Sequence, residues 1–397
     1  MVVPTASPQT LWTRGFFAVI GTQVAANYAA STFLLLPKYL ATEFHASPND
    51  IGHVNAIPGL VAVLIVPFVG GFLDRVGRRP LMAAGAALAC AHSLAWIGID
   101  RLSPAVYALQ ILAGLSWMFS FSGSSTLVTD HAPPEKLSQA IGVFGAANIS
   151  MNAFAPAIAE PTAEHFGWRA AFALAAAAAA LSLLLSRLVT EPARQHVAGA
   201  GDEADLAATL SVARRLLPYV FAMVTCGAAF GAVFTFYQPF VIAQGAKQVS
   251  TFFVGFMLAA VSTRLGLGSL ADRVGRRRVA LRAFAVYVLV VLAMTQLAPN
   301  RLLWLGLAFG AAHGFFYPAL TGLALEVTAT RERGRAMTII TGAFNLGNTS
   351  SVMTFGWVAH VYGYQQVFVL AALVTCLGVA VLYVDGLRRT SSAASTP

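Results

Sequence analysis

Charged side chains are scarce in this chain of 397 residues. Asp, Glu, Lys and Arg make up 10% of the sequence, whereas apolar residues make up 57% and the mean hydropathy is +0.71. A soluble domain carries about 25% charged residues, so the composition excludes a protein whose only solvent is water. The net charge of +9 does not call for a nucleic-acid partner, because the basic residues cluster between apolar runs, where they set membrane orientation.

Cysteine is also scarce. Cys90, Cys226 and Cys376 lie far apart inside apolar runs, so we expect small buried side chains rather than a disulfide framework or a metal site. No His, Cys and Met residues are spaced as metal ligands. The chain has no Walker loop and no Ser/His/Asp arrangement outside the apolar runs. The sequence therefore predicts no ATP hydrolysis, no enzyme activity and no cofactor.

One loop motif is present twice. Residues 70–80 read GGFLDRVGRRP and residues 268–278 read GSLADRVGRRR, so an Asp-Arg-x-Gly-Arg-Arg element recurs after 198 positions at the end of an apolar run. Asp130 and Glu326 lie 196 positions apart, as do the segments FGWR (166–169) and YGYQ (362–365). Repetition of this length in so apolar a chain predicts a polytopic membrane transporter made of two related bundles.

The apolar runs define the expected helices. A membrane span needs about 20 apolar residues at a rise of 1.5 Å each. We expect an all-α membrane protein of twelve transmembrane helices, with an N-terminal six-helix bundle over 1–189, an aqueous linker over 190–215 and a C-terminal six-helix bundle over 216–397. The predicted spans are 14–38, 50–72, 80–99, 104–129, 138–161, 167–189, 216–242, 249–271, 279–298, 301–326, 335–360 and 364–385.

The basic residues predict the orientation of these spans. Nineteen of the 25 Lys and Arg residues fall on the side that holds both termini and the linker, five fall on the other side, and Arg264 lies inside a span. By the positive-inside rule, both termini and the linker are expected in the cytoplasm. We expect a multi-pass protein of the bacterial inner membrane, monomeric, with the lipid bilayer around it.

The two loop motifs resemble those of the major facilitator superfamily. Residues 74–79 and 272–277 are similar to the family's signature between helices 2–3 and 8–9, and residues 134–136 and 331–335 are similar to its basic loops between helices 4–5 and 10–11. The resemblance covers essentially the whole chain. It implies two six-helix bundles that rock around a central cavity, which opens alternately to each side.

Two segments depart from the pattern of the family's proton-coupled drug exporters. Gln110 stands in helix 4 where those exporters carry arginine, and residues 155–160 of helix 5 keep the proline of their motif but lose its glycines. The resemblance to a standard drug–proton antiporter is therefore weaker than the resemblance to the superfamily.

Polar residues inside the spans are the candidates for substrate binding. Charges at membrane depth are costly and usually mark a pathway, so Arg264 is expected to hold an anionic group or to pair with an acid. The amides on helices 1, 5 and 11 are expected to face the central cavity, although hydrogen bonding between helices is the alternative for each of them. The full candidate set is Gln23, Asn27, Gln110, Asn148, Asn152, Tyr237, Gln238, Arg264, His313, Tyr317, Asn345 and Asn348.

Two residues are candidates for proton coupling and eight for gating. A buried carboxyl titrates closer to neutrality and an imidazole does so by nature, which selects Glu160 and His313. Asp130 and Glu326 are expected to pair with the loop arginines as a latch that forms in one conformation and breaks in another. The gating set is Asp74, Arg75, Arg78, Asp130, Asp272, Arg273, Arg276 and Glu326.

Together these features predict a secondary transporter that exports a small organic molecule in exchange for protons by alternating access. Two alternatives stay open from the sequence. One is a proton symporter that imports an organic anion held by Arg264. The other is a membrane protein that serves as a sensor or assembly partner and transports nothing.

Overall fold

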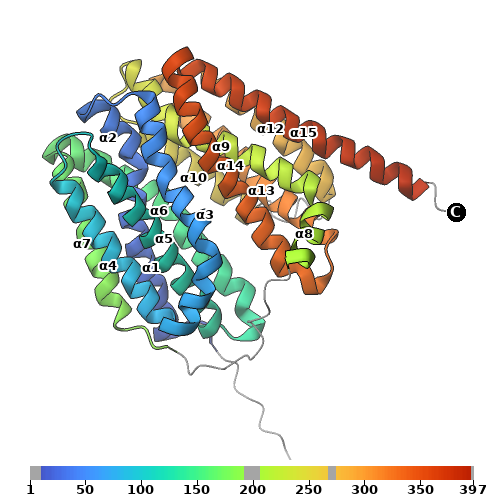
Figure 1. The fold of residues 1–397 in the computed structure, drawn as a ribbon, viewed down its shortest axis with the longest axis horizontal. Helices are drawn as coiled ribbons and strands as arrows, with labels where there is room; N and C mark the ends of the chain where they lie inside the picture. The colour runs from blue at the N-terminus through green and yellow to red at the C-terminus, as the bar shows by residue number, and fades with distance from the viewer. Residues whose placement is uncertain (1–9, 192–205, 267–273, 395–397) are drawn as a thin grey trace, which may run out of the picture. The chain divides into compact units, whose positions relative to one another are not determined.

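The computed structural model describes residues 10–191, 206–266 and 274–394 (Figure 1). Every regular element within these ranges is a helix. The long helices of the first half are α1 (Arg14–Thr32), α3 (Pro48–Val76), α4 (Arg78–Ile97), α5 (Pro104–His131), α6 (Leu137–Phe166) and α7 (Trp168–Ser186). Those of the second half are α9 (Leu217–Ala243), α10 (Ser250–Gly266), α12 (Arg276–Ala293), α13 (Leu302–Glu326), α14 (Arg333–Tyr362) and α15 (Tyr364–Ala394).

The predicted twelve spans are present as helices. Ten helical segments of the described chain are long and apolar enough to cross a bilayer, and the apolar part of α10 is shorter. The remaining helix, α14, is continuous over 30 residues, but Asn345, Asn348 and several threonines and serines interrupt its apolar sequence. A helix of that length spans the hydrocarbon core with residues to spare, and its polar residues indicate that part of its surface does not face lipid.

Local chemistry explains where several helices begin and end. At α1, the Thr13 hydroxyl accepts a hydrogen bond from the N–H of Phe16 at 3.1 Å, and at α3, Ser47 and Asp50 form a reciprocal capping box. Gly77, between α3 and α4, and Gly275, directly before α12, each have a φ of 99°, a conformation that side chains with a Cβ rarely adopt. The glycine of the repeated loop motif thus has the same backbone conformation in both halves.

The first span is not continuous. After α1 the chain passes through a 3-10 turn at Phe33–Leu35 into α2 (Leu36–Glu43), which has Pro37 at its start. Proline cannot donate to the preceding turn, which accounts for the break. A short helix, α8 (Leu206–Arg215), lies in the linker.

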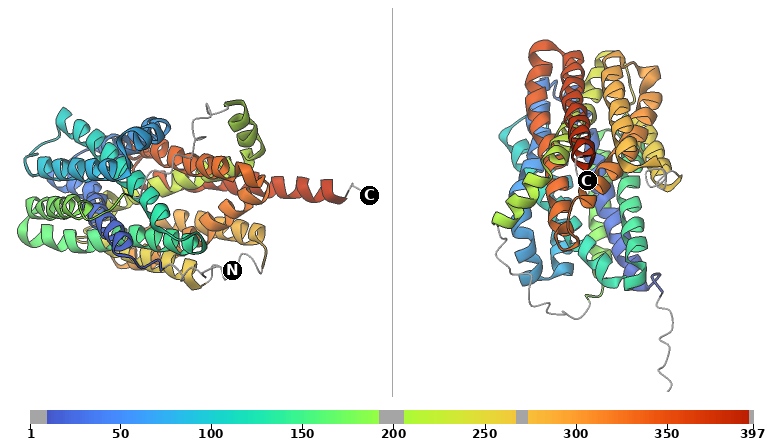
Figure 2. Two further views of the ribbon diagram at one scale, coloured as in Figure 1. Left: turned by 90° about the horizontal axis from the view of Figure 1, so that it is seen from below. Right: turned by 90° about the vertical axis from the view of Figure 1, so that its right-hand side faces the viewer.

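The helices of the two halves pack in the same order. In the first half α1 packs on α6 and α7, and α4 packs on α5 and α7 (Figure 1); in the second half α9 packs on α14 and α15, and α12 packs on α13 and α15. Because α9, α12, α13, α14 and α15 follow α1, α4, α5, α6 and α7 at about the repeat distance, the internal repeat predicted from the sequence is also present in the packing of the helices. α15 continues past its neighbours toward the C-terminus (Figure 2).

By their contacts, the helices form two compact units. One comprises Met1–Leu34 and Leu64–Gln195, and the other comprises Leu35–Val63 and His196–Pro397. α2 and the first part of α3 therefore group with the second half of the chain by contact. The division into bundles at 1–189 and 216–397 is based on the sequence repeat and stays a prediction.

Small residues bring helices together within each unit. A Cβ added to Gly85 would lie 2.4 Å from the backbone nitrogen of Ser120, and one added to Gly310 would lie 2.1 Å from the carbonyl oxygen of Phe256. Neither position tolerates a side chain without moving a helix. Close packing of this kind is the main source of helix association in lipid, where burial of apolar surface contributes little.

Candidate functional site

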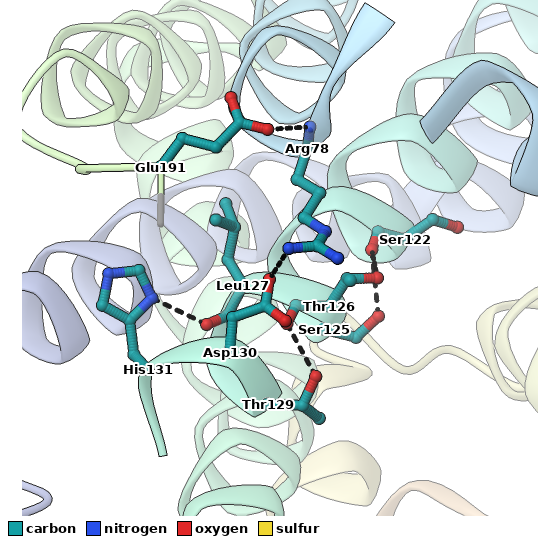
Figure 3. Close-up of polar contacts among 9 residues, drawn as sticks. All are labelled: Arg78, Ser122, Ser125, Thr126, Leu127, Thr129, Asp130, His131 and Glu191. Carbon is teal, nitrogen blue, oxygen red and sulfur yellow. Dashed lines mark hydrogen bonds and ion pairs between the residues drawn. The ribbon is translucent and has the colours of Figure 1, made fainter. Parts of the chain in front are cut away.

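The loop between α3 and α4 carries an ion-pair network. The Arg78 guanidinium pairs with the carboxylate of Asp130 at the end of α5, and the Arg78 backbone N–H donates to Glu191 Oε1 at 2.8 Å. Figure 3 shows these two acids on different sides of Arg78. A carboxylate at the first N–H of α4 also compensates the positive end of the helix dipole. Arg78 thus joins three segments: the start of α4, the end of α5 and the end of the first half.

The equivalent loop of the second half makes the equivalent ion pair. Arg276 Nη1 lies 3.0 Å from Glu326 Oε1 at the end of α13. Arg276 follows Arg78 by 198 positions, and Glu326 follows Asp130 by 196. The expected pairing of Asp130 and Glu326 with loop arginines is therefore found in both halves, whereas their role in gating stays a prediction.

A second arginine in each loop binds the backbone of another helix. Arg79 Nε donates to the carbonyl oxygen of Ser186 at 3.0 Å, and Arg277 donates to the carbonyl oxygen of Leu382. Arg277 also pairs with Asp385 at 3.2 Å. Ser186 and Leu382 again lie 196 positions apart. Arg79, Arg277, Glu191 and Asp385 are not among the site residues expected from the sequence. Membership of the repeated loop motif was the available signal for the two arginines, and charge was the available signal for the two acids.

The other gating candidates are described in part or not at all. Arg75 is exposed at the end of α3, and the side chain of Asp74 beside it is not described. Asp272 and Arg273 lie outside the described residues. Arg264 is on α10, but its side chain is likewise not described.

The amides of α1 and α6 form one hydrogen-bonded row. Gln23 Nε2 donates to Asn148 Oδ1 at 2.8 Å, and Asn27 Nδ2 donates to the Asn148 carbonyl oxygen at 2.7 Å. One turn further, the Ser31 hydroxyl donates to Asn152 Oδ1 at 2.9 Å. Gln23 and Asn27 are buried, whereas Asn148 and Asn152 are half-buried. The row holds α1 on α6, and its α6 side chains keep exposed surface.

Next to this row is a buried hydroxyl with no polar contact. The Tyr28 oxygen is buried and has no hydrogen-bond partner among the described residues. An unsatisfied polar group costs free energy unless another molecule supplies a partner.

Gln110, the candidate on α5, is buried at 3% exposure.

Two candidates on α9 lie in the packed interior of the second unit. Tyr237 and Gln238 are fully buried. The Tyr237 hydroxyl donates to the carbonyl oxygen of Val249 at 3.0 Å, and Gln238 Nε2 donates to that of Phe234 at 3.2 Å. The Tyr237 bond connects the end of α9 to the start of α10, and the Gln238 bond lies within α9. Both side chains therefore stabilise the structure, apart from any role in binding.

His313 on α13 is enclosed by aromatic rings. Its ring centroid lies 5.1 Å from that of Phe230, 5.6 Å from that of Tyr317 and 5.9 Å from that of Phe344. His313 is buried, but these three rings are half-buried, as are Asn345 and Asn348 on α14. The second unit therefore has a partly exposed surface of aromatic rings and amides, formed by α9, α13 and α14.

The candidate acid Glu160 is fully buried in α6, directly before Pro161. No group of three or more His, Cys, Asp and Glu in the described ranges is arranged to hold a metal ion.

Comparison with known proteins identifies the family. The family model for the Major Facilitator Superfamily matches residues 16–263 and 220–396, so it matches each half of the chain in turn. The chain belongs to the major facilitator superfamily. It is therefore a secondary transporter, which moves small molecules across a membrane without hydrolysing ATP, and it is not an enzyme.

Individual members of the superfamily match along most of the chain. Multidrug resistance protein MdtG from Enterobacter lignolyticus is 25% identical over 352 residues, which cover 86% of this chain and 84% of MdtG. MdtG from Salmonella paratyphi A is 24% identical over 353 residues, with 85% of each chain covered. Among solved structures, the nucleoside transporter NupG has a TM-score of 0.79 at 14% identity and covers 94% of this chain and 98% of its own.

A second structure of the superfamily is a bacterial homolog of the human lysosomal transporter Spinster in an inward-facing conformation. It has a TM-score of 0.73 at 14% identity and covers 95% of this chain and 97% of its own. At such identities these structures establish the shared fold alone. The fold expected from the sequence, two six-helix bundles of the superfamily, is confirmed.

Proposed function

We propose that this transporter exports small amphipathic organic molecules from the bacterial cytoplasm in exchange for protons. The relatives that match along the chain are named for multidrug resistance, which favours export and a broad substrate range. The excess of Lys and Arg on the side of the termini and linker supports a cytoplasmic location of the arginine-rich loops. Both termini would then lie in the cytoplasm of a cell whose inner membrane holds the protein.

We infer the substrate class from the mixed aromatic and amide surface of the second unit. Phe230, Tyr317 and Phe344 offer half-buried ring faces, and Asn345 and Asn348 offer donors and acceptors beside them. Ring faces bind apolar groups and attract cations, while neutral amides hydrogen-bond without selecting one charge. Such a surface fits molecules that have an aromatic or apolar body and a few polar groups.

In the first unit, the partly exposed Asn148 and Asn152 and the Tyr28 hydroxyl are further groups that we propose for substrate binding. Arg264 on α10 and Gln110 on α5 also belong to the proposed substrate-binding set. Tyr237 and Gln238 belong to it as well, in addition to making the structural hydrogen bonds described above. Binding by a few groups on several helices fits alternating access, since rocking of the bundles changes which of them the substrate contacts.

We assign proton coupling to Glu160, with His313 as the second candidate. Glu160 is a buried carboxyl on α6, and a charge at membrane depth is usually functional. If protonation of this carboxyl drives the cycle, Glu160→Gln mimics the protonated state permanently. Exchange of substrate across the membrane then continues, but a pH gradient no longer drives accumulation.

Proteoliposomes with an acidic lumen test the proposal. A fluorescent amphipathic cation is added outside, and its uptake is recorded together with luminal pH. Antiport predicts uptake coupled to alkalinisation of the lumen. Proton flow in the same direction as the substrate would instead establish symport, and absence of coupling with any dye or pooled metabolite would remove the proton from the mechanism.

A matched pair of variants separates coupling from folding. Glu160→Gln is compared with Glu164→Gln, which changes an exposed carboxylate one turn further along α6. We expect Glu160→Gln to keep dye counterflow and lose gradient-driven uptake, with Glu164→Gln close to the unmodified protein. Equal behaviour of the two variants would contradict the role of Glu160, and the same comparison with His313→Gln and His92→Gln then tests the second candidate.

A further inference from the structure

A groove lies between α12 and α13 on the surface of the second unit. Its volume is about 430 Å³, and its lining is apolar except for Arg282. Ala283, Ala311 and Ala312 line it together with larger apolar side chains such as Val286 and Phe315. Because the three alanines have small side chains and lie where the two helices pack side by side, a groove remains between the helices. The volume falls within the range of pockets that hold small molecules.

The groove opens on a face that contacts lipid. α12 belongs to a segment apolar enough to span the membrane, and Val286, Leu289 and Leu292 on it are 48%, 63% and 45% exposed. Positions 282, 286 and 289 follow a helical repeat, so they share a face. Apolar side chains exposed along a spanning helix meet hydrocarbon, so the groove is open to the bilayer from the side.

Two arginines lie at the end of this face. Arg278 and Arg282 are exposed and one turn apart at the start of α12, so they lie on the same face of the helix. Arg276 and Arg277 are engaged by Glu326 and Asp385. In the part of the chain that the structure describes, neither Arg278 nor Arg282 has an ion pair or hydrogen bond. Two adjacent like charges without an acid repel each other, and an anion between them would relieve this repulsion.

We propose that this groove binds an anionic phospholipid, with one acyl chain against the three alanines and the headgroup phosphate on Arg278 and Arg282. The spacing fits this ligand, because the arginines lie within the first two turns of the span and Val286 lies about 6 Å deeper at 1.5 Å per residue. Basic pockets between spanning helices on the cytoplasmic side are suited to anionic headgroups.

The charge, and not the apolar lining, gives the site its selectivity. Lipid chains leave an equally apolar bilayer when they enter the groove, so burial of the chain alone contributes little. The transported molecule is a less suitable occupant, because Arg282 is the sole polar side chain in the described lining. The inference rests on the membrane location of the chain and is independent of the proposed substrate and coupling.

Native mass spectrometry of the purified full chain tests the site. The protein is titrated with phosphatidylglycerol and, separately, with phosphatidylcholine of the same acyl chains. We expect phosphatidylglycerol to bind more tightly, and the Arg278→Gln/Arg282→Gln double variant to weaken its binding roughly tenfold or more. Arg278→Lys/Arg282→Lys keeps both charges and is expected to retain most of the binding.

Two controls complete the test. Arg331→Gln/Arg333→Gln removes the same charge from exposed positions elsewhere and should leave phosphatidylglycerol binding within about twofold; equal loss in both double variants would overturn the site. Ala283→Leu fills the groove and should abolish the preference for long-chain over short-chain phosphatidylglycerol. Phosphatidylcholine binding as tight as phosphatidylglycerol binding, or displacement of the lipid by a transported dye, would also overturn the proposal.

Discussion

Gly52 on α3 packs directly against Gly356 on α14. A Cβ added to Gly52 would lie 2.9 Å from the Cα of Gly356 and 2.7 Å from the carbonyl oxygen of Val352, and one added to Gly59 would lie 2.1 Å from the Thr349 hydroxyl oxygen. The start of α3 and the second part of α14 thus approach to backbone contact, which only small residues permit.

This contact predicts that Gly52→Leu forces α3 and α14 apart. We expect slower transport, and faster reaction of a cysteine placed at Asn55 with a membrane-impermeant thiol reagent in a chain without Cys90, Cys226 and Cys376. Gly71→Leu on the same helix is the control, because a Cβ there meets nothing within 4 Å. Unchanged labelling and transport in Gly52→Leu would show that the two helices need not approach during the cycle.

The two repeated ion pairs predict a conformational role that charge reversal can reveal. Asp130→Asn leaves the Arg78 guanidinium without its carboxylate, and we expect slower transport with little change in the affinity for substrate. The Arg78→Asp/Asp130→Arg exchange should recover part of the rate. Glu332→Gln serves as the control because it breaks the Arg215–Glu332 pair of 2.7 Å at a different place. A loss of affinity in Asp130→Asn, with the rate unchanged, would assign the pair to binding instead.

The amide row predicts a measurable coupling between α1 and α6. Asn148→Ala removes the acceptor of Gln23 Nε2, and we expect a loss of about 1 kcal/mol of stability, within the range for hydrogen bonds between membrane helices. A double-mutant cycle of Gln23→Ala and Asn148→Ala, followed by thermal unfolding in detergent, measures the pair. A coupling near zero would mean that other groups or water replace this bond.

The aromatic surface predicts a loss of substrate affinity without a loss of fold. For an amphipathic cationic dye, we expect Phe344→Ala and Tyr317→Ala to raise KM roughly fivefold, since a ring over a partly exposed cation contributes about 1 kcal/mol. Trp357→Ala, which removes an exposed ring from the same helix as Phe344, should leave KM unchanged. An equal rise of KM in Trp357→Ala would argue against a local effect.

Much of the fold could be predicted from the sequence because the same pattern of motifs and apolar runs occurs in both halves. The motif at Gly77 and Gly275 marks a turn in each, and the packing order of the helices repeats accordingly. Helix ends were less predictable: α6 continues to Phe166 past the expected end at 161, and α15 continues past 385. Both extensions contain polar residues, such as Glu164 in α6 and Arg388 in α15, which continue a helix without continuing the apolar run that identifies it.

The candidate site was predictable only in its residue types. Charge and spacing selected Asp130 and Glu326, and the structure provides their arginines. Spacing could not distinguish Asn148, which keeps exposed surface, from Gln238, which is enclosed, because both are amides in spans with the same pattern. Burial is decided by neighbours far along the chain, and a helical period does not record it.

The bonds of Arg79 and Arg277 end on backbone carbonyl oxygens, and every residue has one. Substitution at Ser186 or Leu382 therefore leaves the acceptor in place, and these two positions do carry unrelated side chains. After a duplication, each half could accumulate substitutions in the helix that accepts the hydrogen bond without losing that hydrogen bond. Only the arginine had to be inherited intact, so the same attachment persists in two sequences that have otherwise drifted apart.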